Sequence, residues 1–328
     1  MARSRRPARR PGRRSRALSL PASRRSRALS RAAALAAGFA ADRVFGDPRK
    51  HHPVAWFGTA ASELGRRMWA DSKPRGAAYT AALVGVPTVA AVVVGKRFPN
   101  TLLAVATWAA LGGTTLARTG ERMADRLDAA DVAASRELVP WLCSRDPDAL
   151  DLDGIARATV ESLSENTSDA VTGTLLWGAA LGAPGVVAHR CANTLDAMVG
   201  YRTEKWANFG WASATFDDLV NWAPARLTGV ATVLAGPDRA GAWRAWRADA
   251  SKHPSPNAGI PEASTAGALG VQLGGPTNYP GGVEMRPTLG TGPAPRVADV
   301  RRAVTLTRRV QDIVAALCIG GVLVVALA

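Results

Sequence analysis

Two long apolar blocks, separated by only five residues, constrain this chain more than any other feature of its sequence. Residues 77–95 and 101–117 each approach the roughly 20 apolar residues that an α-helix needs to cross a bilayer. The charged and turn-forming residues between them, 96–100, predict a sharp reversal of the chain. The two blocks therefore predict a transmembrane hairpin.

Three further apolar blocks, residues 32–45, 170–188 and 313–328, support membrane embedding. The second contains Gly178 and Gly182 at the GxxxG spacing that allows close helix packing. Several arginines precede the third, which predicts that the preceding loop is cytoplasmic and that the block is a terminal anchor. Any single block could be a buried core helix, but five in one chain favour a membrane protein.

The remaining sequence predicts a mainly α-helical fold, with polar helices and Gly/Pro-rich loops on the cytoplasmic side. Residues 151–164 carry apolar side chains at helical spacing, and residues 237–252 form an amphipathic helix. Residues 253–300 are rich in Gly and Pro and predict an ordered loop. Because no stretch shows strand-like alternation, we expect a polytopic, mainly α integral protein of the cell membrane.

The basic excess of the chain lies in its first 31 residues. They contain twelve Arg and no acid, so without them the net charge of +15 falls to +3. We expect residues 1–31 to be a disordered tail and residues 32–328 to be the membrane domain. The tail could anchor to an anionic leaflet or have no function; it alone suggests nucleic acid, which is not an expected partner.

Polar clusters adjoin the apolar blocks, where charged groups are costly and usually functional. The first spans residues 46–54 and contains His52. The second carries Glu161, Glu165 and Asp169, four residues apart, so a continuous helix would place three carboxylates on one face. Like charges at this spacing repel, which favours a bound divalent cation or a cationic partner.

Two more clusters follow, together with a segment that resembles a ligand loop. The third cluster spans residues 193–210. The fourth places Asp217 and Asn221 one helical turn apart, a spacing that suits Mg²⁺ shared with phosphate. Arg226 could add a bidentate phosphate or carboxylate contact. The predicted ligand loop is residues 253–262.

Each cluster also has a structural explanation. Ser164 or Asn166 could cap helices, and Asp217–Asp218 could begin a solvated helix. The chain contains no GxxxxGK[ST], HExxH or paired CxxC motif, so a nucleotide site would not be a P-loop. Its three scattered cysteines predict neither a disulfide framework nor a zinc site.

In this order, the clusters resemble the adenosylcobinamide-phosphate synthase family (CobD/CbiB) of cobalamin biosynthesis. The resemblance covers roughly residues 35–328. It rests on GDPRKHHPV at 46–54, VESLSENTSD at 160–169, NTLDAMVGY at 193–201, FGWASATFDDLVNWAPARLTG at 209–229 and HPSPNAGIPEASTAGALGVQLGG at 253–275. Thr215 stands where the family usually has Arg, Ala192 where it often has Asn, and the Arg-rich tail is not a family feature.

The resemblance implies a membrane-bound amide ligase. The family joins a propionate of adenosylcobyric acid to the amine of (R)-1-amino-2-propanol or its O-2-phosphate, giving adenosylcobinamide or its phosphate. A carboxylate and an ammonium do not form an amide spontaneously, so ATP, Mg²⁺ and an acyl phosphate are expected, with the amine neutral. The implied partners are the corrinoid, the amine and the lipid bilayer, with room for other membrane enzymes of the pathway.

Under this hypothesis the polar residues divide into three roles. The carboxylates that hold Mg²⁺ or accept a proton are Glu165, Asp169, Asp217 and Asp218, with Glu165, Asp217 and Asp218 as the metal ligands. Lys205 and Arg226 neutralise phosphate charge in the transition state. The other substrate-binding residues are His52, Asn166, Asn193, Asp196, Tyr201, Asn221, Asn257 and Glu262.

Two alternatives from other classes stay open at this point. An Mg²⁺-dependent membrane transferase acting on a diphosphate would use Asp217–Asn221, but it predicts a second Asp-rich motif that the chain lacks. A membrane signalling or accessory protein on the related AmpE-like scaffold predicts degenerate polar clusters, whereas SENTSD, NTLD and DDLVN are intact.

Overall fold

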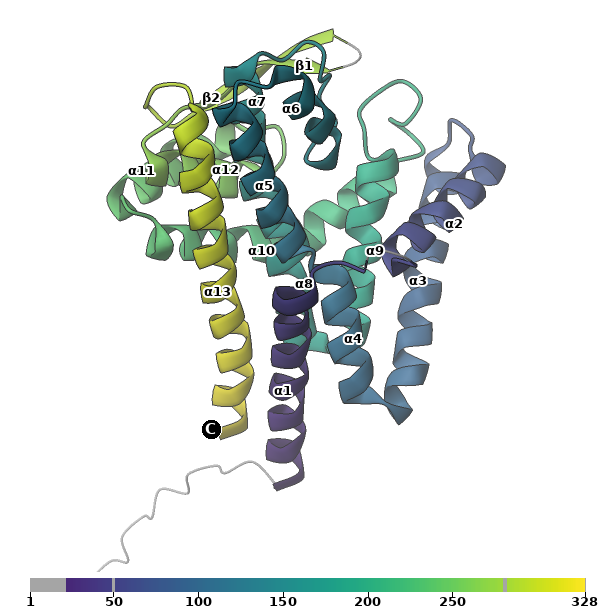
Figure 1. Ribbon diagram of the computed structural model, residues 1–328. Coiled ribbons are helices and arrows are strands. Elements are labelled where there is room, and N and C mark those ends of the chain that lie inside the picture. Colours follow the sequence, from purple (N-terminus) through teal and green to yellow (C-terminus); the bar gives the residue numbers. More distant parts are fainter. Residues whose placement is uncertain (1–21, 49–50, 280–281, 328) are drawn as a thin grey trace, which may run out of the picture.

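Long helices set the architecture of the chain (Figure 1). The computed structural model describes residues 22–48, 51–279 and 282–327. The elements are α1 (Ala22–Phe45), α2 (Pro53–Met68), α3 (Lys73–Arg97), α4 (Pro99–Leu111), α5 (Gly113–Asp128), α6 (Val132–Leu138), η1 (Val139–Trp141), α7 (Leu152–Asn166), η2 (Thr167–Thr172), α8 (Gly173–Leu181), α9 (Ala183–Val199), α10 (Trp211–Ala235), α11 (Arg239–Asp249), η3 (Ala250–Lys252), α12 (Gly259–Leu269), β1 (Leu273–Tyr279), β2 (Gly282–Leu289) and α13 (Val297–Leu327). The prediction of a mainly α-helical protein is confirmed.

The molecule has two ends of different character (Figure 1). The apolar end holds the N-terminal part of α1, the α3–α4 turn and the C-terminal part of α13. The cavity end holds α6, α7, α11, α12 and the β1–β2 hairpin. Helix α13 connects the two ends, because it packs on α1 toward the apolar end and on α5 and α7 toward the cavity end.

The block at 77–95 forms the middle of α3, a single helix of 25 residues. At 1.5 Å per residue such a helix is about 37 Å long, enough to cross a bilayer. Its Val86 and Val89 side chains are 70% and 61% exposed, which is costly in water. Within the described residues, α3 is the one helix that is both long and apolar enough to span a membrane.

The block at 101–117 is not one helix, contrary to the prediction. Gly112 has φ 65°, a left-handed conformation that glycine adopts without strain, and it ends α4. Helix α4 has 13 residues and is therefore about 20 Å long, short of the roughly 30 Å hydrocarbon core. The last residues of the block belong to α5, which continues toward the cavity end.

The block at 170–188 is also broken, and it forms a helical hairpin instead of one crossing. Gly182 has φ 71° and separates α8 from α9, which pack against each other. The close packing predicted from the GxxxG spacing is present at Gly178, where a Cβ atom would meet Leu35 Cδ2 at 2.8 Å. The helix preceding α8 widens into the π-helix η2, a feature frequent at functional sites.

Three other boundaries differ from the predictions. Helix α1 begins at Ala22, so the last residues of the predicted disordered tail are helical, while residues 1–21 lie outside the described residues. The block at 32–45 forms part of α1, and the described residues of the block at 313–328 form the end of α13. The predicted loop at 253–300 in fact contains α12 and the antiparallel β1–β2 hairpin. Strand alternation was not recognised there because β1 includes Gly274 and Gly275, both with positive φ.

Candidate functional site

A cavity of about 330 Å³ lies where α7, η2 and α9 meet the β1–β2 hairpin. Of the predicted site residues, it brings together Glu165, Asn166, Asp169, Asn193, Asp196 and Tyr201. The three-carboxylate face predicted for residues 161–169 is confirmed, since Glu161 lines the same cavity. The chain positions further lining residues before α7 and on the hairpin, namely Cys143, Ser144, Arg145, Tyr279 and Arg286.

Two arginines that the sequence analysis missed form the cationic side of the cavity. Arg145 is 5% exposed and makes a buried ion pair with Glu161 through Nη2. Glu161 also accepts a hydrogen bond from the Gly274 backbone nitrogen at 2.7 Å, which ties α7 to β1. Arg145 Nη1 is buried and has no hydrogen-bond partner among the described residues. One edge of a buried cation is therefore available for an anion.

Arg286 extends from β2 into a second buried charge cluster. Its Nη1 lies 3.9 Å from Glu161 Oε2, and its Nη2 lies 3.5 Å from Glu262 Oε1 and contacts His253 Nε2. Burial and the Arg286 charge lower the pKa of His253 to about 4, so this imidazole is neutral at pH 7. Burial, followed by the charge of Glu161, raises the pKa of Glu262 well above its usual value. Glu262 thus supports the wall behind the cavity and does not line it.

The anionic side of the site crowds several carboxylates. Burial raises the pKa of Glu165. Burial, with Asp218 and Glu165 nearby, raises the pKa of Asp196 to about 6. Burial, with Asp196 nearby, raises the pKa of Asp217 to about 8. Crowded carboxylates favour either a proton or a cation between them.

Amide side chains hold these carboxylates in place. Asn193 lies near both Asp169 and Asp217 and counteracts part of the rise in their pKa values, so it lies between η2 and α10. Asn221 Nδ2 donates to Asp217 Oδ1 at 2.8 Å, and Asn221 Oδ1 pairs with His189 Nε2 at 2.8 Å. Asn221 is therefore a positioning residue behind Asp217. The sequence assigns Asp217 and Asn221 to Mg²⁺ shared with phosphate; in the structure the two side chains bond to each other, and the metal assignment stays a prediction.

The first polar cluster meets the cavity through an arginine. His52 caps α2 by accepting a hydrogen bond from the Val54 nitrogen at 3.2 Å, which is a structural role. Burial, with Arg190 nearby, lowers the pKa of His52, and Asp47 acts in the opposite direction. Arg190 is also close to Asp169 and donates to Asn193 Oδ1 at 3.3 Å. Arg190 thus links residues 46–54 to the carboxylates.

Comparison with known proteins places this arrangement in a family. The family model described as "CobD/Cbib protein" matches residues 35–307. A curated "Cobalamin biosynthesis protein CobD" of Mycobacterium tuberculosis is 49% identical over 282 residues, covering 84% of this chain and 90% of that protein. The chain belongs to the CobD/CbiB family. This membership supports a role in cobalamin biosynthesis.

Relatives of the same printed name occur in distant bacteria. The Chromobacterium violaceum protein is 42% identical over 299 residues, covering 87% of this chain and 94% of its own length. The Geobacter metallireducens protein is 41% identical over 264 residues, covering 76% and 83%. No solved structure matches the chain. The matched span of the CobD/CbiB family includes every residue of the cavity described above.

Several residues predicted from the CobD/CbiB resemblance lie outside the cavity. Lys205 is exposed and stacks over the Trp206 ring at 4.5 Å. Arg226 Nη1 donates to Asn257 Oδ1 at 3.0 Å, and its guanidinium lies 4.4 Å from the Trp222 ring centre. The hydrogen bond between Arg226 and Asn257 thereby positions the loop before α12.

Arg226 lines a second cavity instead of the first. This hollow has a volume of about 530 Å³ and is lined by Arg226, Arg247, His253 and Ser255, among others. Asn257 Nδ2 donates to the Asp218 carbonyl oxygen at 2.7 Å, so the loop is tied to α10. Asp218 itself is half-buried and close to Arg202.

The predicted Mg²⁺ ligands do not converge on a preformed metal site. In the part of the chain that the structure describes, no group of three His, Cys, Asp or Glu side chains is arranged to hold a metal ion. The oxygen donors of Glu165, Asp169 and Asn193 nevertheless suit Mg²⁺ chemically, because this ion retains several waters and often uses one or two carboxylates with substrate phosphates.

Proposed function

We propose that this chain is a membrane enzyme that uses ATP to join a propionate carboxylate of adenosylcobyric acid to (R)-1-amino-2-propanol or its O-2-phosphate. The observation that carries the proposal is one cavity lined both by Arg145, whose Nη1 has no hydrogen-bond partner among the described residues, and by the carboxylates of Glu165, Asp169 and Asp196. The reaction brings together anions, which are the propionate and the phosphates of ATP, and a cation, which is the amine.

The arginines supply the anion-binding half of the reaction. A guanidinium presents a planar fork that matches carboxylate and phosphate oxygens. Arg145 is buried and Arg286 nearly so, and both keep their charge because Glu161 and Glu262 neutralise part of it. A propionate oxygen would attack the γ-phosphorus of ATP, forming an acyl phosphate and releasing ADP, while these cations stabilise the phosphoryl charge.

The carboxylates supply the amine-binding half. An ammonium entering the cavity is attracted by Glu165 and Asp169. Asp196 has a pKa of about 6, closer to neutral pH than an ordinary carboxylate, which suits a general base. The ammonium passes one proton to Asp196, and the neutral nitrogen attacks the acyl carbon. The bond between that carbon and the phosphate oxygen then breaks, and a second nitrogen proton leaves with the phosphate as the amide forms.

Mg²⁺ would supply neutralisation of the ATP phosphate charge, with Glu165 and Asp169 as the nearest ligands in the cavity and Asp217 reached through Asn193. Arg145 and Arg286 form their ion pairs with Glu161 and Glu262, which leaves Glu165 and Asp169 for the metal ion. Asn166, at the end of α7, donates hydrogen bonds to Leu142 O at 3.3 Å and to Ser162 O at 3.0 Å. The first of these bonds fixes the loop before α7 against the end of that helix.

The cavity volume limits which part of the corrinoid can enter. At about 330 Å³ it lies at the lower end of the roughly 300–1,000 Å³ typical of small-molecule pockets. It therefore suits the propionate arm and the aminopropanol, and the corrin ring stays at the surface. Tyr201, 45% exposed at the rim, is placed to contact the ring.

We also propose that the apolar end is embedded in the membrane as several segments and that the cavity faces the cytoplasm, where ATP is available. Exposed apolar side chains on α3, α4 and α13 support embedding, among them Val93, Val105 and Val324. By the positive-inside rule, Lys96 and Arg97 at the apolar end favour the opposite orientation, whereas the four arginines of α13 between residues 301 and 309, which lie toward the cavity end beside α5, favour a cytoplasmic cavity. Labelling of single cysteines at Glu204 and Lys96 in intact cells decides between them: protection of position 204 with labelling of position 96 supports a cytoplasmic cavity.

Complementation tests the enzymatic proposal. The gene, with and without residues 1–27, is expressed in a bacterium that lacks its own aminopropanol-attaching enzyme and needs cobalamin to grow. Growth with cobyric acid, together with cobinamide or its phosphate detected by mass spectrometry, supports the ligase. Growth with cobinamide only, with the protein present in the membrane, contradicts it.

A further inference from the structure

Helix α10 is amphipathic in the reverse of the usual sense. Polar side chains lie on its buried face, namely Ser213, Asp217, Asn221, Thr228 and Thr232. They bond to neighbouring elements: Ser213 Oγ and Thr80 Oγ1 of α3 lie 2.7 Å apart, and Thr228 Oγ1 donates to Thr172 Oγ1 of η2 at 2.8 Å. A surface helix of a protein in water buries its apolar stripe and exposes its polar face. Helix α10 does the opposite.

Large apolar side chains cover the exposed face of α10. Leu219 is 70% exposed and Trp222 is 57% exposed, and Trp211, Val230 and Leu234 are exposed as well. Their positions follow the helical repeat closely enough to form one stripe along the helix. Contiguous exposed apolar surface of this kind is costly in water and marks a contact with a membrane or another protein.

Helix α10 runs across the molecule between its two ends (Figure 1). Ser213, near its start, bonds to α3. Gly229, in its second half, packs on α11, since a Cβ atom there would meet Trp246 Cζ3 at 2.8 Å. Helices α3 and α11 lie on opposite sides of Figure 1, whereas α3 itself extends toward the apolar end. Helix α10 can therefore lie along the surface of a membrane that α3 crosses.

Two exposed tryptophans of α10 each carry a cation over the ring. Lys73 Nζ lies 5.4 Å from the centre of the Trp211 ring, and the Arg226 guanidinium lies 4.4 Å from that of Trp222. Tryptophan and long cationic side chains are typical of the boundary between acyl chains and headgroups, because their stems and rings are apolar and their charged ends reach water. The centre of an interface between two proteins is instead depleted of charge.

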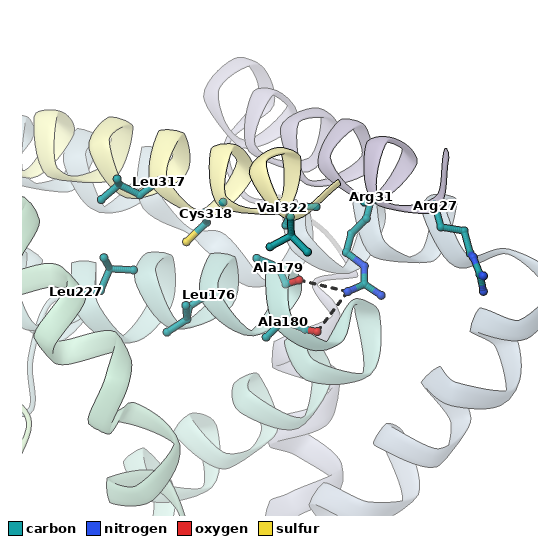
Figure 2. Close-up of a pocket in the computed structure, with 12 residues that line it drawn as sticks. Arg27, Arg31, Leu176, Ala179, Ala180, Leu227, Leu317, Cys318 and Val322 are labelled. Carbon is teal, nitrogen blue, oxygen red and sulfur yellow. Dashed lines mark hydrogen bonds between the residues drawn. The ribbon is translucent and has the colours of Figure 1, made fainter. Parts of the chain in front are cut away.

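We propose that α10 lies along the boundary of the bilayer, with its exposed leucines and valine against the acyl chains. The surface is continuous with the apolar end, because Leu227 at its edge lines the hollow of Figure 2 together with side chains of α8 and α13. Asp217 and Asn221 lie on the opposite face of the same helix, so the carboxylates of the site are held one helix away from lipid. The proposal extends the membrane embedding proposed above and does not depend on the ligase reaction.

Quenching of single labels tests which surroundings the face has. The three native cysteines are replaced by alanine, and Leu219→Cys, Val230→Cys and Leu234→Cys are made one at a time. Each full-length variant carries a fluorescent label and is reconstituted into phosphatidylcholine vesicles. Nitroxide attached to lipid acyl chains should quench all three labels, whereas iodide in the water should quench them about tenfold less than a label in water. Unchanged circular dichroism shows that each variant keeps its fold.

Two control positions separate the possible failures. Val89→Cys on α3 reports the proposed membrane embedding, and Met285→Cys on β2 is an exposed apolar position at the cavity end, which should be reached by iodide only. Lipid quenching at position 89 but not on α10 overturns the proposal and leaves the embedding of α3 intact. Labels on α10 that iodide reaches as well as position 285 place the face in water, and labels that neither quencher reaches place it against a second copy of the chain; either result overturns the proposal. Absence of lipid quenching at position 89 and on α10 overturns the embedding and this proposal together.

Discussion

The cavity lined by Arg145 and Arg286 and a hollow of about 750 Å³ at the apolar end, called here the apolar hollow, are built in opposite ways. The cavity, about 330 Å³, is lined by buried charges that come from distant parts of the sequence, such as Arg145 and Arg286. The apolar hollow lies among α1, α8, α10 and α13 and is lined mainly by aliphatic side chains, with its charged lining residues on α1 alone. Burying a charge is costly unless it is paired, so the cavity depends on many long-range contacts. The apolar hollow needs no such contacts, because it exists where side chains leave space unfilled.

The largest effect on activity is expected when one charge is removed from the cavity without a change in its shape. Asp196→Asn should lower kcat by about 10²–10⁴-fold, since the amine loses its proton acceptor. Glu204→Gln, at an exposed acid that does not line the cavity, should leave kcat within a factor of two or so. Amide product formation from cobyric acid measures both. An active Asp196→Asn enzyme would remove Asp196 from the mechanism.

A second test compares the stability of the two ends. Arg145→Met leaves the buried Glu161 carboxylate without its partner, which should cost about 3–5 kcal/mol. Leu35→Ala, fully buried at the apolar end, should cost a similar 2–5 kcal/mol through a cavity. Chemical denaturation in detergent measures both.

The double variant Arg145→Met/Glu161→Met sharpens that test. It should regain part of the lost stability, because the unpaired Glu161 carboxylate is gone, although the Gly274 N–H loses its acceptor and Arg286 keeps only Glu262 as an acidic partner. It should stay inactive because the anion-binding edge is gone. Recovery of activity along with stability would show that the ion pair only supports the fold.

The pH dependence of stability should also differ between the ends. The pKa of Asp217 is about 8 in the folded protein and 3.8 in the unfolded chain, so between these values only the folded state holds the proton. Stability from this group is therefore lost as pH rises toward 8, by at most about 1.4 kcal/mol per pH unit. Asp217→Asn should lose less stability than the original protein between pH 5 and about 8. Gly321→Leu, in the apolar hollow, should keep the original slope; equal slopes for all three would contradict the assignment.

The sequence predicted the fold best where hydrophobicity alone decides the structure. The block at 77–95 became α3, and the apolar pattern at 151–164 became α7. It failed where single glycines decide. Gly112 and Gly182 adopt left-handed φ values of 65° and 71°, and each divides a block that hydrophobicity reads as continuous.

The site shows the same division. Glu165, Asn166 and Asp169 were predictable because they lie within one helical repeat and share a face. Arg145 and Arg286 were not, since Arg145 pairs with Glu161 across 16 residues, and Arg286 reaches Glu262 from a hairpin that resembles a loop. No local spacing predicts such pairs. The sequence does, however, contain two arginines among acidic motifs, which could have been read as candidate partners of the carboxylates.

The smallest expected effect concerns α13 at the apolar end. Gly320→Ala adds a methyl group that meets nothing within 4 Å, so it should raise stability by roughly 0.5–1 kcal/mol by lowering the entropy of the unfolded chain. At Gly76, which lies in α3 near the cavity end, a Cβ atom would meet the Phe209 carbonyl oxygen at 1.9 Å, so Gly76→Ala should destabilise. Paired denaturation curves measure both changes. If Gly320→Ala also destabilised the protein, the gain expected from reduced chain entropy would be outweighed by a need for glycine at this position of α13.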